Sequence, residues 1–121
     1  MDLQKIQEFQ REFARQRDWE QFHNPKNLAM ALSAEVGELL EIMQWLTPKE
    51  SEEIKDSEKK KTKVSEELAD ITYYVLRIAD ILDIDLDESL WSKMKQNASK
   101  YPVELAKGNA KKYTEFHEEN S

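Results

Sequence analysis

The sequence contains no cysteine, only two glycines and only three prolines among its 121 residues. The absence of cysteine excludes a disulfide framework and a thiolate zinc site. The chain also lacks runs of alternating β-branched residues bounded by glycine turns, which are the usual signature of a β-sheet protein. Hydrophobic residues make up 39% and charged residues 36% of the chain, a composition that favours a helical globular protein over a disordered one.

Long apolar runs and an excess of positive charge are also missing. No run approaches the roughly 18 apolar residues of a membrane span, and residues 1–13 lack the apolar core of a signal peptide. We therefore expect a cytoplasmic protein with no membrane partner. The formal net charge of −7 argues against nucleic acid as a partner. It still permits a small phosphorylated ligand, because divalent cations can bridge carboxylates to phosphates.

Four segments carry apolar residues at the three- and four-residue spacing of amphipathic helices. Short connections between them predict an all-α fold, a four-helix bundle protomer. The chain has more tyrosine, tryptophan and methionine than so small a core can hide, which indicates an oligomer. The expected helices are Leu3–Arg17, Leu28–Leu46, Val64–Leu82 and Leu86–Lys100.

Local signals predict where the helices begin and how the chain is divided. Capping residues precede three helices, and Thr47 with Glu50 forms a capping-box pattern around Pro48. The whole chain, 1–121, is expected to be one domain, with a polar connection at 49–63 and a basic tail at 103–121. The connection could be a loop or a helical extension. The three capping residues are Asp2, Asn24 before Pro25, and Asp85.

Two pairs of carboxylates lie beside apolar helix faces and not on the solvent face. Glu35 and Glu38 are one turn apart in one helix, and Glu67 and Asp70 repeat this spacing in the next. A solvated helix face explains one such pair well, but two pairs on adjacent helices favour a shared site. Buried carboxylates are costly unless they are paired, hydrogen-bonded or metal-bound. We predict that the four acids bind a divalent cation between two antiparallel helices.

The ligand chemistry favours Mg²⁺, with Mn²⁺ able to replace it. All-oxygen ligands suit magnesium, manganese or calcium better than zinc or copper. A di-iron bundle would need Glu-x-x-His motifs on two of its helices, and neither His23 nor His117 stands within three residues after a glutamate on a predicted core helix. Magnesium commonly combines a few carboxylates with waters and substrate phosphates.

Aromatic and polar residues near these helices are further candidates for a binding site. From the residues alone, the aromatic side chains could equally form core, His23 could make a local loop hydrogen bond, and the lysines could be solvated. No Walker loop, glycine-rich cradle or Ser-His-Asp set is present. The candidates are Trp19, His23, Trp45, Tyr74, Lys93 and Asn97.

Several stretches together resemble the MazG-type all-α nucleoside triphosphate pyrophosphohydrolases. EVGEL and EELAD match the E-x-x-E…E-x-x-D motif of that family. The branch that the chain resembles most is that of the dCTP pyrophosphatases, over most of the chain from Phe9 to Glu115 and outside 49–63. The stretches that carry this likeness are RDWEQFHNPKNL, EVGELLEIMQW, EELADITYYV, SKMKQNASKYPV and KGNAKKYTE.

The resemblance implies an activity and residue roles. Family members cleave nucleoside triphosphates between the α and β phosphates, a house-cleaning of nucleotide pools, and this branch acts as a homotetramer with sites completed by neighbouring subunits. The implied Mg²⁺ ligands are Glu35, Glu38, Glu67 and Asp70. The implied base and sugar contacts are Trp19, His23, Trp45 and Tyr74, and the implied phosphate contacts are Lys93 and Asn97.

The predicted function is metal-assisted hydrolysis of a deoxynucleoside triphosphate, with dCTP or a modified pyrimidine favoured. The metal would neutralise charge on the leaving pyrophosphate, and Glu38 would accept the proton of the attacking water. One alternative is a broad-specificity or dUTP-directed pyrophosphatase. The other is a non-catalytic helical oligomerisation module that binds a structural cation.

Overall fold

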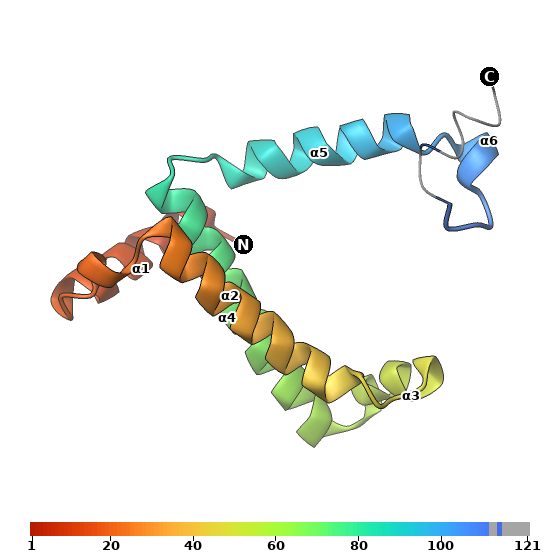
Figure 1. The fold of residues 1–121 in the computed structure, drawn as a ribbon, viewed down its shortest axis with the longest axis horizontal. Helices are drawn as coiled ribbons and strands as arrows, with labels where there is room; N and C mark the ends of the chain where they lie inside the picture. Colours follow the sequence, from red (N-terminus) through yellow and green to blue (C-terminus); the bar gives the residue numbers. More distant parts are fainter. Residues whose placement is uncertain (112–113, 115–121) are drawn as a thin grey trace. The chain divides into compact units, whose positions relative to one another are not determined.

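A computed structural model describes residues 1–111 and 114 of the chain. The regular elements of this part are all helical, which confirms the predicted all-α class. Residues 112–113 and 115–121 of the predicted basic tail, His117 among them, lie outside the described residues. The elements are α1 (Leu3–Gln16), η1 (Glu20–Phe22), α2 (Pro25–Met43), α3 (Pro48–Glu52), η2 (Glu53–Asp56), α4 (Glu58–Ile81), α5 (Leu86–Lys100) and α6 (Val103–Ala106) (Figure 1).

The chain divides into two compact units, Met1–Ile84 and Asp85–Ser121. In the first unit, α2 and α4 pack along one another as an antiparallel hairpin, and α1 packs against α4 (Figure 1). Gln10 of α1 is 1% exposed and donates a hydrogen bond from Nε2 to the main-chain oxygen of Tyr73, at 2.9 Å. The hairpin is the arrangement that the predicted convergence of the acidic pairs requires.

The predicted capping residues do begin the helices. Asp2, Asn24 and Asp85 each accept a hydrogen bond from the main-chain N–H three residues later, at 3.1, 2.9 and 3.0 Å. Thr47 and Glu50 form a reciprocal capping box before α3, with bonds of 3.1 and 3.0 Å. These bonds satisfy N–H groups that the first turn of a helix leaves unpaired.

The end of the second helix differs from the prediction. α2 ends at Met43 and not at Leu46, so Trp45 lies in the turn that follows the helix. Pro48 is the first residue of α3 and disfavours a helical conformation at the residue before it. The chain therefore leaves the helix before it reaches the last apolar residue of the predicted stripe.

The polar connection at 49–63 is largely helical. It contains most of α3, all of η2 and the first turns of α4, which begins at Glu58 instead of the predicted Val64. Ser57 caps α4 by accepting a hydrogen bond from the N–H of Lys60 at 3.4 Å. Ile54 in this segment is 6% exposed, so the connection contributes one residue to the core.

The core of the first unit is small for its length. Val36 of α2 and Leu68 of α4, apolar residues of two predicted amphipathic helices, are 47% and 50% exposed. The buried hydrophobic residues are Ala14, Leu28, Ile54, Leu76 and Ala79.

None of the described helices has the length and apolar character needed to cross a membrane.

In the second unit, α5 has the predicted bounds, and Pro102 follows its end and precedes α6. Leu90 and Met94, two apolar residues of α5, are 57% and 41% exposed. The arrangement of the four long helices as one bundle, and the oligomer, stay predictions.

A candidate metal and nucleotide site

Three of the four predicted metal ligands meet between α2 and α4. Glu35, Glu38 and Glu67 each offer one carboxylate oxygen, and these oxygens lie within 4.8 Å of one another. The first two residues are three apart, so they share one face of α2. Helix α4 packs antiparallel to α2 (Figure 1), and the carboxylate of Glu67 on α4 meets that face. We call these three side chains the carboxylate cluster.

The carboxylate cluster contains buried oxygens with no partner. Glu35 and Glu67 each bury their Oε2 atom without a hydrogen bond from any described residue. No arginine or lysine among the described residues forms an ion pair with either carboxylate. A buried acceptor that lacks a partner destabilises the fold, so the cluster fits a divalent cation that takes oxygen ligands.

The close approach of the three carboxyls changes their affinity for protons. Burial, hydrogen bonds with Glu35 and Glu38 and the negative charge of both raise the pKa of Glu67 to about 7. A hydrogen bond with Glu67 lowers the pKa of Glu35, but burial and the neighbouring carboxylates outweigh it and raise the pKa. Such a bond exists only while one partner keeps its proton. When Glu35 and Glu67 are both ionised, their buried oxygens have no hydrogen-bond partner. Ionised carboxylates are also the form that a bound cation requires.

Asp70, the fourth predicted ligand, is not within the 4.8 Å set. It follows Glu67 by one turn of α4, and its charge contributes to the raised pKa of Glu35. Burial and the charges of Glu35 and Asp70 also raise the pKa of Tyr74. Asp70 therefore adjoins the carboxylate cluster on one side and an aromatic group on the other.

An aromatic pocket of about 270 Å³ opens beside Asp70. Trp19, His23 and Tyr74, three of the four predicted base and sugar contacts, line it together. The rings of Trp19 and His23 have centroids 6.3 Å apart. Aromatic walls of this kind stack on planar bases. The complete lining is Phe9, Phe13, Trp19, His23, Asp70, Tyr73 and Tyr74.

The other three predicted substrate contacts are not brought to this pocket within the first unit. Trp45 is 85% exposed in the turn after α2 and is not part of the pocket lining. Lys93 and Asn97 lie on α5 in the second unit, where Lys93 donates a hydrogen bond to Gln96 Oε1 at 3.2 Å. Their contacts with a substrate stay predictions.

Comparison with known proteins identifies the family of the chain. The profile of the MazG-like family matches residues 30–116, which is more than half of the chain. The chain belongs to the MazG-like family. The proteins named dCTP pyrophosphatase 1 from Mus musculus and Homo sapiens are each 42% identical to it over 114 residues, covering 94% of this chain and 67% of theirs.

A solved structure also resembles this MazG-like chain. It is a pyrophosphatase from Archaeoglobus fulgidus DSM 4304, 40% identical, with a TM-score of 0.75 over 84% of this chain and 94% of its own. The prediction of a MazG-type pyrophosphohydrolase close to the dCTP branch is confirmed by these relatives. Membership of this family also implies use of a divalent metal, which agrees with the carboxylate cluster.

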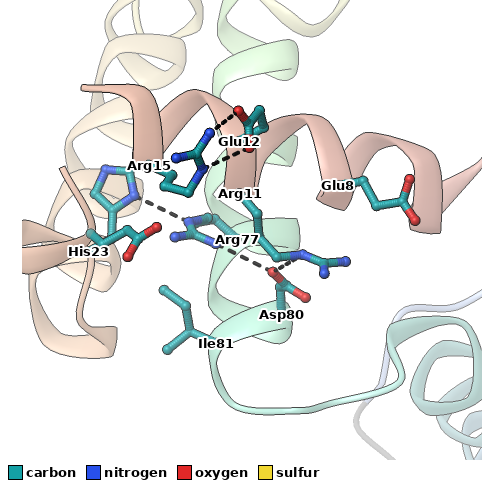
Figure 2. A pocket seen from close by; sticks show the side chains of 9 residues that line it. Glu8, Arg11, Glu12, Arg15, His23, Arg77, Asp80 and Ile81 are labelled. Atoms are coloured by element: carbon teal, nitrogen blue, oxygen red, sulfur yellow. Dashed lines mark hydrogen bonds and ion pairs between the residues drawn. The ribbon is translucent and has the colours of Figure 1, made fainter. Parts of the chain in front are cut away.

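The sequence reasoning missed one buried charged residue of the MazG-like chain. Arg77 of α4 is 5% exposed, and its guanidinium contacts both His23 and Asp80 (Figure 2). A weak signal was available, because Arg77 stands between Leu76 and Ile78 in the most apolar part of the predicted helix. An arginine inside an apolar stretch is rarely buried without a specific partner.

Proposed function

We propose that this chain is a Mg²⁺-dependent pyrophosphohydrolase that converts deoxynucleoside triphosphates to the monophosphate and pyrophosphate. The preferred substrate is dCTP or a modified pyrimidine deoxynucleotide. One observation carries the proposal: a cluster of carboxylates with unpaired buried oxygens adjoins an aromatic pocket through Asp70. The relatives from Mus musculus and Homo sapiens are named dCTP pyrophosphatase 1, which supports the choice of dCTP.

The carboxylates have distinct roles in this proposal. When bound, Mg²⁺ neutralises charge on the phosphates and on the departing pyrophosphate. Its ligands would be the carboxylate cluster and Asp70. Glu38 is the exposed member of the cluster, so a water from solvent reaches its carboxylate most easily. We assign Glu38 the role of general base, which takes a proton from the attacking water.

The aromatic pocket would hold the nucleoside in this proposal. Trp19 and His23 form the wall against the base, and Tyr74 stands near the sugar, where it would exclude a 2′-hydroxyl by its bulk. Trp45 would complete the enclosure of the base. Lys93 and Asn97 would contact phosphate oxygens. The proposal also includes a cytoplasmic location and a homotetramer, which would cover apolar residues such as Val36 and Leu90 that are exposed in one chain.

A substrate panel with identified products tests the proposal. The purified chain is incubated with Mg²⁺ and each of dCTP, dUTP, dTTP, dATP, dGTP and CTP, and products are separated by chromatography. We expect dCMP and pyrophosphate from dCTP, loss of activity with EDTA, and slower cleavage of CTP if Tyr74 excludes the 2′-hydroxyl. Release of inorganic phosphate contradicts the proposed bond cleavage, and inertness toward every substrate supports the non-catalytic helical module.

Replacement of Lys93 by Ala tests the proposed phosphate contact. We expect the KM for dCTP to rise about tenfold with little change in kcat, because one charge-assisted contact contributes roughly 1.4 kcal/mol. Steady-state kinetics measure both constants. Lys95→Ala, an exposed lysine on the same helix, is the control. An unchanged KM in Lys93→Ala would remove Lys93 from the site.

A further inference from the structure

Arg77 is held in one orientation by two partners. Its Nε donates a hydrogen bond to Nδ1 of His23 at 3.2 Å, and its Nη1 pairs with Oδ2 of Asp80 at 3.3 Å (Figure 2). Arg11 of α1 reaches the same oxygen of Asp80 with its Nε at 3.1 Å. A buried guanidinium is tolerated only when its charge is paired. The two contacts of Arg77 itself, with His23 and with Asp80, therefore fix the guanidinium against the imidazole.

The contact with Arg77 determines which nitrogen of His23 carries the proton. A guanidinium has donors and no acceptor, so Nδ1 must offer its lone pair, and the proton of the neutral ring lies on Nε2. A proton on Nδ1 would point at a like charge. In agreement, burial and the charge of Arg77 lower the pKa of His23. The ring is thus kept neutral and in the Nε2–H tautomer.

His23 stands between two pockets. It lines the pocket of about 540 Å³ that holds Arg77 and Asp80, and it also lines the aromatic pocket with Trp19 and Tyr74. Figure 2 shows its second ring nitrogen on the edge of the imidazole that faces away from Arg77. Within residues 1–111 and 114, the only hydrogen bond of the ring is the one to Nδ1. The wall of the aromatic pocket thus carries an N–H donor whose orientation is fixed.

We propose that Arg77 is a positioning residue for base recognition, which presents Nε2–H of His23 to a hydrogen-bond acceptor on the nucleobase. This inference rests on the proposed function, in which the aromatic pocket holds the base. Cytosine has acceptors at ring N3 and at the O2 carbonyl, whereas N3 of uracil and thymine carries a hydrogen. A donor that meets N3 favours cytosine over uracil and thymine, because these two bases would leave it facing a second donor.

Nitrogen NMR tests the tautomer without any need for activity. The chain contains only two histidines, His23 and His117, so a His117→Ala variant assigns the imidazole signals of the labelled protein. At neutral pH we expect the Nε2–H tautomer for His23, and loss of that preference in Arg77→Met. Arg11→Gln removes only the outer contact to Asp80 and is expected to keep the tautomer. A wild-type His23 that is protonated on Nδ1 overturns the inference, even if the Arg77 variant does not fold.

Kinetics test the link between this tautomer and the base. We expect Arg77→Met to raise the KM for dCTP about five- to tenfold, the loss of roughly one hydrogen bond, with little change in kcat. Arg77→Lys keeps a charged donor and should rescue part of the loss, and Arg11→Gln should match the wild type. A smaller effect with dUTP supports contact at N3, and an equal effect supports contact at O2.

The outcomes separate this inference from the proposed function. A wild-type chain that releases no pyrophosphate from any deoxynucleoside triphosphate overturns the proposed function and, with it, base recognition. An active wild type whose KM values do not change in Arg77→Met overturns only the inference. Circular dichroism of Arg77→Met establishes that a change in KM is not a loss of the helical fold.

Discussion

Glu38→Gln is expected to lower the turnover of dCTP by roughly 10³-fold, within the range that a lost general base produces. Glutamine has the same shape but cannot take a proton at neutral pH, and it is a weaker ligand for Mg²⁺. Glu38 is exposed, so the helical circular dichroism should not change. Product release is measured at saturating dCTP and Mg²⁺.

A control variant and a magnesium titration test this prediction further. Glu58→Gln makes the same substitution at an exposed position in the first turn of α4 and should retain wild-type turnover. A magnesium titration separates the two roles of Glu38. Recovery of the rate at high Mg²⁺ would show that Glu38 is a ligand only, and a near-wild-type rate at ordinary Mg²⁺ would remove it from the site.

Glu67→Gln is expected to abolish turnover and yet to stabilise the metal-free protein. The pKa of Glu67 is raised from 4.5 to about 7 in the folded chain, so the folded state binds the proton more tightly than the unfolded state. The metal-free wild type therefore loses stability as the pH rises from about 4.5 through about 7, with no further loss above that. Glutamine cannot ionise, so the variant lacks this loss.

Thermal melts in EDTA across this pH range measure the effect. Above pH 7 the variant should melt a few degrees higher than the wild type, and the difference should vanish at low pH. Added Mg²⁺ should raise the melting temperature of the wild type far more than that of the variant, because ligands that bind only the folded state stabilise it. Glu58→Gln should follow the wild type. If the melting temperatures of the wild type and Glu67→Gln change with pH in parallel, the raised pKa of Glu67 is contradicted.

Local features of this fold could be predicted from the sequence. Asp2, Asn24 and Asp85 are short polar residues directly before apolar periodic segments, and each caps a helix. The spacing of Glu35 and Glu38 placed both carboxylates on one face of a helix wherever that helix packs. These predictions succeeded because each depends on residues within one helical turn of each other.

Features that depend on tertiary packing could not be predicted in the same way. The hydrogen bond between His23 and Arg77 joins residues 54 positions apart, and no periodicity indicates it. Leu90 and Met94 give α5 an apolar face, but the sequence does not indicate which part of the protein covers that face. Trp45 was expected within the second helix because the apolar pattern continues to Leu46, but the chain leaves that helix at Met43.

The raised pKa of Glu67 has a consequence for how the carboxylate cluster would bind a divalent cation. Near neutrality Glu67 is only partly ionised, so the binding of a divalent cation there would release a fraction of a proton into the buffer. The heat of metal uptake in calorimetry should then vary with the ionisation enthalpy of that buffer. Slight acidification should then weaken the binding of the cation.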